Sequence, residues 1–485
     1  MSDWAPRRER EAALAALDAR LLREPEAVEP RFERASLLAA LGRNEEAKAA
    51  YLALLGRAPT HFGALNNLGT LLDEMGYRSA ARTAYAEAVA HHPDNPLGHV
   101  NLANLLLAAG ELAAARAHYQ TALRLDPNHA EAHQGLANLL AEEGDAAAAE
   151  AHRRRAFKDR AVTALPYRGA GEPIPLLLLI ATEGGNIPTK NLLDDRRFLT
   201  FALAAEYFDP SAALPPHRLI FNAIGDADLC SRALAAASAI VARSTAPIIN
   251  PPAAVLATAR LANASRLGAL ADVVSPRMAA LTRRSLAAGD GPALLGHVGL
   301  GFPLLLRSPG FHTGRHFVKV EREDELAAAV ALLPGDDVLA IQYLDARGAD
   351  GKSRKYRVMM IGGEIFPLHM AASLDWKVHY FTAEMADHPE HRAEEAAFLS
   401  DLPRVLGPRA LAALTRIRDL LSLDYGGVDF GLGADGEVLL FEANATMVVN
   451  PPDQDERWTY RREAVERILD AVRRMLAAKA GHPRF

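Results

Sequence analysis

Three oxygen-bearing side chains lie close together near the end of the chain. Asp429 belongs to one strand of a predicted β-hairpin, and Glu442 and Asn444 belong to the other, with a turn over 433–436. Residues two apart point to the same face of a strand, so Glu442 and Asn444 share a face and Asp429 can lie opposite them. Oxygen ligands of this kind suit magnesium better than zinc. The spacing predicts a magnesium site, although a hairpin with one solvent-facing polar side has the same alternation.

A second group of candidate functional side chains lies over 368–380. It combines imidazoles, a hydroxyl, a cation and two aromatic rings: His369, Ser373, Trp376, Lys377, His379 and Tyr380. Such groups can line the pocket of an acceptor substrate, although a polar surface loop held by a tryptophan has the same composition. Two more histidines, His312 and His316, flank a glycine-containing segment and are open to the same two interpretations.

The composition argues against several classes of protein. Lys and Arg total 54 against 60 Asp and Glu, and a net charge of -6 gives no general attraction to nucleic acid or to an anionic membrane. The single cysteine, Cys230, precludes an intramolecular disulfide and is compatible with a reducing compartment. The densest apolar run, 174–181, is too short to cross a bilayer. We expect a cytoplasmic protein that binds neither nucleic acid nor membrane.

The first third of the chain repeats every 34 residues. Prolines, glycines and tyrosines share this step: Pro25, Pro59, Pro93 and Pro127; Gly42, Gly76, Gly110 and Gly144; Tyr51, Tyr85 and Tyr119. Glycine suits the turn between two helices, and proline follows the second helix because it cannot continue it. Each unit is therefore predicted to be a helical hairpin. The pattern resembles the tetratricopeptide repeat (TPR), which implies an all-α solenoid over 1–160.

Four asparagines recur on the predicted first helices of the hairpins. Asn67 and Asn101 are one repeat apart, and so are Asn104 and Asn138. A side-chain amide both donates and accepts hydrogen bonds, which suits the backbone of an extended peptide. The resemblance implies that these helices line a concave face, where a peptide or protein substrate would bind. A spacer or a dimerisation arm is the alternative.

The composition and the pattern of apolar residues change after the repeats. A stretch containing glycine and proline predicts a linker over 161–175. Apolar runs alternating with helical patterns then predict an α/β domain over 176–255, with strands at Leu176–Ala181, Arg218–Ala223, Ala239–Ala242 and Ile248–Ile249. Strand pairs joined by glycine turns predict an α+β region over 256–485, in which 461–479 has the pattern of an amphipathic helix.

The C-terminal hairpin carries a second family resemblance. Val428-Asp429-Phe430 with Phe441-Glu442-Ala443-Asn444 resembles the metal-binding hairpin of ATP-grasp enzymes, such as glutathione synthetase and D-alanine:D-alanine ligase. Other matches come in that superfamily's order: Ile249 to Pro252, Gly301 to Pro309, a lid at Gly310 to His316, a hinge at Ala340 to Leu344, and Lys355 to Val358. The resemblance covers about 174–477. It implies a multidomain fold, in which the all-α TPR solenoid is followed by an α/β pre-ATP-grasp domain and α+β ATP-grasp lobes with a C-terminal helix.

The same resemblance implies roles for individual residues. Arg307 and Arg357 would contact the phosphates of ATP and act in catalysis, and Asp429, Glu442 and Asn444 would bind Mg²⁺. The adenine would lie at the hinge, against Gln342, Tyr343 and Leu344. The acceptor would lie against His369, Ser373, Trp376 and Lys377. Two positions depart from the family pattern, because many relatives carry lysine at Arg307 and glutamate at Gln342.

The implied activity is that of an ATP-dependent carboxylate–amine ligase. An acceptor carboxylate would form an acylphosphate, which an amine would convert to an amide with release of ADP and phosphate. The solenoid would recruit a peptide or protein, and the co-substrate would be a small-molecule amine or carboxylate. One alternative is a TPR scaffold protein with a degenerate nucleotide-binding region, since fold membership does not prove function. Another is a ligase that acts on two small molecules.

Overall fold

The computed structural model describes residues 7–309, 316–378, 383, 385–453 and 455–481. The chain divides into two compact units. The first unit contains Met1–Leu178 and Leu193–His217, and the second contains Leu179–Leu192 and Arg218–Phe485. The boundary falls within strand β2 (Ile174–Ile180), after the end of the solenoid predicted from the sequence.

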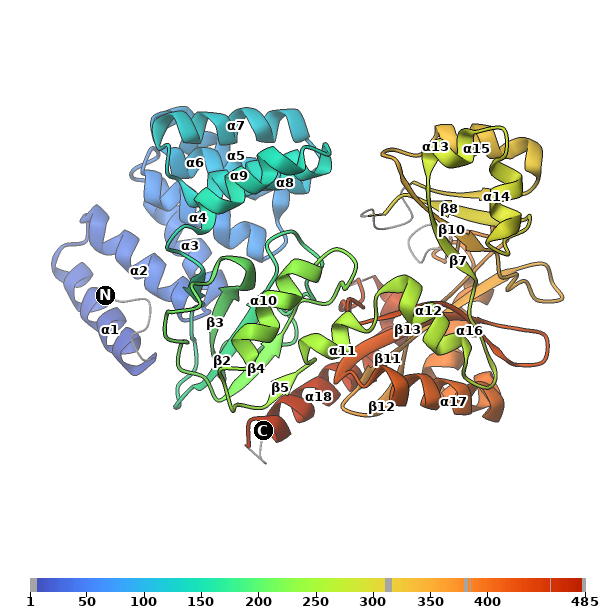
Figure 1. Ribbon diagram of the computed structural model, residues 1–485. Helices are drawn as coiled ribbons and strands as arrows, with labels where there is room; N and C mark the ends of the chain where they lie inside the picture. The colour runs from blue at the N-terminus through green and yellow to red at the C-terminus, as the bar shows by residue number, and fades with distance from the viewer. Residues whose placement is uncertain (1–6, 310–315, 379–382, 384, 454, 482–485) are drawn as a thin grey trace. The chain divides into compact units, whose positions relative to one another are not determined.

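The first unit begins with a stack of antiparallel helices (Figure 1). Helix α1 (Arg7–Arg23) is followed by the hairpins α2–α3 (Val28–Ala40, Asn44–Leu55), α4–α5 (Phe62–Glu74, Arg78–His91), α6–α7 (Pro96–Ala108, Leu112–Leu125) and α8–α9 (Ala130–Glu142, Ala146–Phe157). Gly42, Gly76, Gly110 and Gly144 have positive φ in the turns inside the hairpins, a conformation that side chains other than glycine's rarely allow. The predicted helical hairpins are confirmed.

Buried leucines and tyrosines form a continuous core between neighbouring hairpins. The rings of Tyr51, Tyr85 and Tyr119 are each at most 5% exposed in this core. At the end of the stack, Arg153 occupies the tyrosine position, and the ring of Phe157 stacks on Tyr207 at a centroid distance of 5.4 Å. The last helix of the solenoid is thus covered by η1 (Ala205–Tyr207).

The segment after the solenoid differs from the sequence prediction in two places. The predicted linker contains strand β1 (Val162–Ala164), which pairs antiparallel with β3 (Phe198–Ala204). The strand predicted at Ala239–Ala242 is wrong, because 239–241 complete helix α10 (Ser231–Val241). Leu234, Ala237 and Ile240 are buried at a helical spacing, which a short apolar run does not distinguish from a strand. Strands β4 (Leu219–Asn222) and β5 (Ile248–Ile249) pair in parallel, as α/β folds do.

The second unit contains a four-stranded antiparallel sheet. Its order is β7-β10-β8-β9, built from Met278–Thr282, Asp337–Gln342, Leu304–Arg307 and Phe317–Val320. Short helices α13 (Arg283–Ala287), α14 (Gly291–His297) and α15 (Leu326–Ala331) supply Leu286, Leu295 and Leu326 to the core of this sheet. The other short elements of this unit are α11 (Pro252–Leu256), α12 (Arg260–Gly268) and η2 (Glu323–Glu325).

A five-stranded sheet of order β12-β11-β13-β14-β6 forms the other part of this unit. Its strands are Glu364–Ser373, Ser353–Ile361, Tyr425–Leu432, Val438–Asn444 and Val273–Val274. Helices α16 (Pro389–Ser400), α17 (Leu402–Leu421) and α18 (Arg462–Lys479) pack on it, and η3 (Glu456–Arg461) leads into α18 (Figure 1). A mixed α/β region therefore follows the solenoid, as predicted. Among the described helices, none is long and apolar enough to span a bilayer.

Two pairs of histidines lie one repeat apart in the solenoid. The Nδ1 atoms of His99 and His118 are 2.9 Å apart, and those of His133 and His152 are 2.8 Å apart. The Nε2 atoms of His99 and His133 donate to the carbonyls of Pro93 and Pro127. Their Nδ1 atoms must then accept from the partner ring in the neutral state. Each pair is thus arranged around uncharged imidazoles.

We expect acid to destabilise the solenoid through these pairs. Burial lowers the pKa of His118, His133 and His152 from the usual value, so below pH ~6.5 the unfolded chain takes up protons that the folded chain does not. The unfolding free energy that the neutral histidine pairs contribute above pH ~6.5 is therefore lost as the pH falls. The hairpin α4–α5 shows which residues can replace such a pair, because it has Leu65 at the position of His99 and Ala84 at the position of His118.

The matched variant replaces His99 and His133 by Leu and His118 and His152 by Ala. Its Tm should fall less than that of the wild type between pH 7.5 and 5.5, followed by circular dichroism. Each kcal/mol lost lowers Tm by about 2–4 °C in a unit of this size. Equal falls in the two proteins would show that the pairs do not contribute.

Candidate functional site

Four functional side chains form one row across the five-stranded sheet. The strand register places His369 opposite Arg357, Arg357 opposite Asp429, and Asp429 opposite Glu442. The row therefore crosses β12, β11, β13 and β14 in turn. Asn444 lies two residues after Glu442 on β14, on the face that it shares with Glu442. The three predicted oxygen donors are thus together, because β13 and β14 are neighbours in sequence and pair directly.

Asp429 lies at the centre of this row and is 3% exposed. Its two carboxylate oxygens accept from Arg357 at 2.5 and 2.7 Å and from Lys355 at 3.1 Å. Burial by itself raises the pKa of Asp429, but the charges of Lys355 and Arg357 outweigh burial and hold it well below its usual value. Asp429 is therefore ionised and fully paired in this structure.

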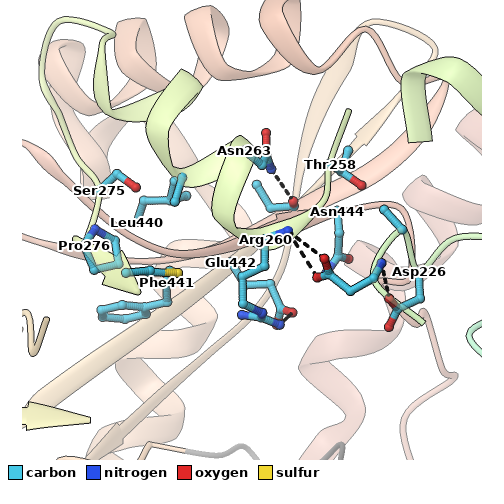
Figure 2. A pocket seen from close by; sticks show the side chains of 15 residues that line it. Asp226, Thr258, Arg260, Asn263, Ser275, Pro276, Leu440, Phe441, Glu442 and Asn444 are labelled. Atoms are coloured by element: carbon cyan, nitrogen blue, oxygen red, sulfur yellow. Dashed lines mark hydrogen bonds and ion pairs between the residues drawn. The ribbon is translucent and has the colours of Figure 1, made fainter. Parts of the chain in front are cut away.

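Glu442 is paired with a cation from a different part of the chain. Figure 2 shows the side chain of Arg260, at the start of α12, turned towards Glu442, and the two groups are 2.5 Å apart. Burial is the largest single influence and raises the pKa of Glu442, but the charges of Arg260, Arg307 and Arg357 together outweigh it and lower the pKa below its usual value. Asn263, one turn later on α12, donates to the carbonyl of Ala443 at 2.8 Å. These contacts attach α12 to β14 and fix Arg260 beside the row.

The amide of Asn444 is already used in a local turn. Its Oδ1 accepts from the backbone N and the hydroxyl of Thr446, at 3.0 and 2.9 Å. Carboxylate and amide oxygens form the donor set that magnesium prefers, so the chemistry of Asp429, Glu442 and Asn444 fits this ion. Binding an ion would require Arg260, Lys355 and Arg357 to release the two carboxylates.

The row opens into a large cavity whose lining comes from both sheets of the second unit. Its volume is about 920 Å³, near the top of the ~300–1,000 Å³ range of small-molecule sites. Among the described lining residues, seven carry positive charge and three carry negative charge: Arg260, Arg307, Arg354, Lys355, Arg357, Lys377 and Arg461, against Asp429, Glu442 and Asp453. In a chain of net charge -6, this local excess favours a polyanionic ligand.

One end of the cavity is lined mainly by apolar and aromatic groups. Gln342, Tyr343 and Leu344 reach it from the end of β10, and Phe317 reaches it from β9. The Oε1 of Gln342 accepts from the backbone N of Arg277 at 3.1 Å, which leaves its NH₂ group as a donor for a ligand. Trp376 packs edge-on against Phe317 at a centroid distance of 5.4 Å. This end suits a flat heterocycle.

Arg307 lies on β8 and also lines the cavity. Burial lowers its pKa, and Arg260 lowers it further. Two cations therefore lie close to Glu442 at this side of the row. The negative charges of Glu442, Asp226 and Asp228 offset the repulsion between Arg260 and Arg307. An anionic group entering the cavity would relieve their repulsion.

Most of the predicted acceptor residues line the cavity, but Ser373 does not belong to the described lining. His369, Trp376 and Lys377 do belong to it. Ser373 ends β12, where its hydroxyl accepts from the backbone N of Asp375 at 3.0 Å. The side chain is therefore used to shape a turn. His312, His379 and Tyr380 lie outside the described residues, as does all but His316 of the predicted lid.

Sequence reasoning gave no role to several cavity residues. The sequence could have indicated Lys355, because it lies two residues before Arg357 and therefore shares its face of β11. Arg260, Trp458 and Arg461 have no such signal, since they reach the cavity from α12 and η3, which are not strands of the row. Tertiary packing alone brings them to the site.

The asparagines of the solenoid make contacts within the stack. Asn101 Nδ2 donates to Asn66 Oδ1 at 2.7 Å, which links two repeats, and Asn67 lies 3.5 Å from the Tyr51 hydroxyl. Asn104 Oδ1 accepts from the Tyr119 hydroxyl at 2.6 Å. The hydroxyls of Ser36 and Thr70 make the equivalent contacts with Tyr51 and Tyr85. Asn104 thus occupies the same repeat position as Ser36 and Thr70, where the side chain hydrogen-bonds to a buried tyrosine. Asn138 occupies this position in the next repeat and is exposed.

The comparisons with known proteins concern this helical part. Three family models described as tetratricopeptide repeat match residues 28–61, 66–128 and 106–158. Residues 28–158 form tetratricopeptide repeats. Such repeats are typical of protein–protein interaction or scaffolding. No curated protein matches the chain.

Two solved structures that resemble the chain each cover about a third of it. MamA from Desulfovibrio magneticus RS-1 is 24% identical over 31% of this chain and 84% of its own, with a TM-score of 0.28. YrrB, described as a TPR protein with an unusual peptide-binding site, is 20% identical over 32% of this chain and 79% of its own, with a TM-score of 0.27.

We expect the stability of the second unit to depend on Asp429. In Asp429→Asn the buried charges of Lys355 and Arg357 lose their counter-ion, which should cost about 3 kcal/mol of unfolding free energy. Urea unfolding measures the loss. Asp345→Asn is the matched control, since Asp345 pairs with Arg347 on the surface and its loss should leave stability nearly unchanged. Equal stability of the two variants would contradict the role given to Asp429.

Proposed function

We propose that the protein is an ATP-dependent ligase that joins a carboxylate to an amine through an acylphosphate. The observation that carries the proposal is the cavity in the second unit, where the oxygens of Asp429, Glu442 and Asn444 meet a marked excess of cations. Magnesium and a triphosphate together need both kinds of group. The ordered resemblance to ATP-grasp enzymes supports the same assignment.

The nucleotide would occupy the aromatic end and the adjoining part of the row. The base would lie against Tyr343 and Leu344, with the NH₂ group of Gln342 as a hydrogen-bond donor. The phosphates of the nucleotide would extend towards Arg307, which lies near Arg260 and Glu442. Arg307 offers a planar fork that matches two phosphate oxygens, in place of the point charge of lysine.

Asp429, Glu442 and Asn444 would hold Mg²⁺ through oxygen atoms. When bound, the ion supplies positive charge that neutralises the phosphates during transfer. The chain's own residues exchange partners at this point, because Arg260, Lys355 and Arg357 neutralise the same carboxylates in the present structure. Arg357 would then be available to the phosphoryl group or to the acceptor carboxylate.

The reaction needs positioning and positive charge. In the first step an acceptor carboxylate oxygen bonds to the γ-phosphorus while the bond to the β,γ-bridging oxygen breaks, which gives an acylphosphate and ADP. In the second step the amine nitrogen attacks the acyl carbon, the carbon–oxygen bond to phosphate breaks, and a proton leaves the nitrogen for phosphate or solvent. Arg307 and Arg357 would stabilise the charge on the transferred group. No nucleophile from the protein is needed.

A scaffold protein that binds nucleotide without turnover is the second candidate. Its support is the complete pairing of Asp429 with Lys355 and Arg357, together with the departures at Arg307 and Gln342. The two candidates differ in turnover. A ligase releases ADP when it is given the right carboxylate and amine, whereas a nucleotide-binding scaffold does not.

Nucleotide binding and turnover test the assignment through Arg307 and Glu442. Arg307→Ala should weaken binding of magnesium and a non-hydrolysable ATP analogue by ~10–30-fold, and Arg307→Lys by less, because lysine keeps the charge and loses the fork. Isothermal titration calorimetry measures both. Glu442→Gln should lower ADP formation by ~100-fold with amino acids and peptides as substrates.

The control for this series is Arg322→Ala, which removes an exposed arginine that pairs with Asp324. It should bind nucleotide as the wild type does. Unchanged affinity in Arg307→Ala would remove Arg307 from the nucleotide site. Tight binding without ADP release from any substrate would favour the scaffold.

The solenoid would bring a peptide or protein substrate to this enzyme. This part of the proposal rests on the repeats at 28–158 and on the amides of the first helices. Asn67 and Asn101 lie on α4 and α6 and are half-buried, so their side chains are both held by the stack and accessible from its surface. The predicted peptide contacts of Asn104 and Asn138 belong to the same proposal.

We expect the double variant Asn67→Ala, Asn101→Ala to raise KM for a peptide substrate. Two lost hydrogen bonds of ~1 kcal/mol each correspond to ~30-fold. The KM for ATP should stay the same, and a Tm measurement checks the stack. Asn128→Ala, in the exposed turn between α7 and α8, is the matched control. An unchanged KM for the peptide would make the solenoid an assembly module.

A further inference from the structure

The cavity has a third region that the nucleotide does not account for. Strands lie ~4.8 Å apart, so His369 at one end of the row is ~14 Å from Glu442 at the other. Arg307 and Arg260 lie at the Glu442 end, where the phosphates would bind. Two further residues from the segment that leads into α18, Trp458 and Arg461, line the cavity close to the His369 end. The partner of Arg461, Glu395, accepts from the backbone N of Met370, and Trp458 packs on the cluster that contains Ala371, both close to His369 on β12.

Arg461 is held in this region by a completely buried carboxylate. Its Nε atom is 3.3 Å from Oε1 of Glu395, a residue of α16 that is 0% exposed. The same carboxylate accepts from the Tyr460 hydroxyl at 2.5 Å and from the backbone N of Met370 at 3.3 Å. Two hydrogen-bond donors from two elements therefore hold Glu395, and its ion pair with Arg461 holds the guanidinium at the cavity wall.

The neighbours of Arg461 define a site for one anionic group. Burial, with Arg357 as the next cause, keeps the pKa of His369 well below its usual value, so this ring adds hydrogen bonding without charge. Trp458 packs with Val378 and Met385 and forms an apolar wall. A single fixed guanidinium beside a neutral imidazole and an indole suits a carboxylate on a short carbon chain.

We propose that Arg461 binds a second carboxylate of the acceptor substrate, and that the acceptor is a short dicarboxylic acid or an acidic amino acid. The reacting carboxylate would lie near Arg357 and Asp429, and the other would reach Arg461 at the His369 end of the row. Glu395 is a positioning residue that acts through Arg461. The inference rests on the proposed function, because it assumes that nucleotide fills the rest of the cavity.

The experiment compares acids that differ by one carboxylate. Calorimetry on the full chain, saturated with magnesium and a non-hydrolysable ATP analogue, would measure succinate against butyrate and L-glutamate against L-2-aminobutyrate. We expect the dicarboxylic acids to bind at least ~10-fold more tightly than their partners. Arg461→Met should bring each ratio to about one, and Arg461→Lys should leave an intermediate ratio because it keeps the charge.

Two further variants separate positioning from folding. Glu395→Gln should lower the ratio while the affinity for nucleotide changes less than twofold. Arg457→Met is the matched control, since Arg457 lies in the same 3-10 helix, is half exposed and pairs with Asp455. It should leave both the ratio and the nucleotide affinity unchanged. A variant that only loosens the fold would weaken both acids of a pair alike.

The outcomes separate this inference from the proposed function. Nucleotide binding with no preference for either dicarboxylic acid would overturn the inference and leave the ligase standing. A preference that persists in Arg461→Met would also overturn it. Failure to bind nucleotide at all would remove the proposed function itself.

Discussion

The candidate site depends on how one buried carboxylate is neutralised. Asp429 lies in the middle of the five-stranded sheet, and its charge is balanced by Lys355 and Arg357 from the neighbouring strand. A one-residue slip between β11 and β13 would move both cations to the opposite face and leave the carboxylate buried without a partner. The charge balance therefore favours a single register. That register also places His369 and Glu442, because each pairs with a member of the same row.

The same cations also decide what can bind. A cavity that contains both acidic and basic groups, as the proposed binding of magnesium and nucleotide would require, must keep both kinds from destabilising the protein without ligand. Here Arg260, Lys355 and Arg357 pair with Glu442 and Asp429. Binding of a magnesium nucleotide would replace these ion pairs with others of similar strength. Under the proposed function, the charges of the site would therefore be neutralised both with and without ligand.

In the solenoid, buried neutral polar groups are paired in the same way as the buried charges of the site. Each buried tyrosine hydroxyl needs a partner, and the residue fifteen positions earlier provides one: Ser36, Thr70 and Asn104 for Tyr51, Tyr85 and Tyr119. The requirement is for a polar atom, so three residue types satisfy it. A recurring asparagine in this stack can thus serve the fold, and the periodicity alone does not separate that use from ligand binding.

The sequence by itself determined the repeats and the hairpin of the site. Both depend on contacts between residues that are near in sequence: the glycine turns at a 34-residue step, and β13 and β14 joined by a short turn. The tertiary structure decided the rest, because the remaining contacts join distant segments. Arg260 and Glu442 are 182 residues apart, and Glu395 holds Arg461 from another helix. Ala239–Ala242 and Ser373 show the same limit, since a local apolar run or a lone hydroxyl fits several structures and only its neighbours in space select one.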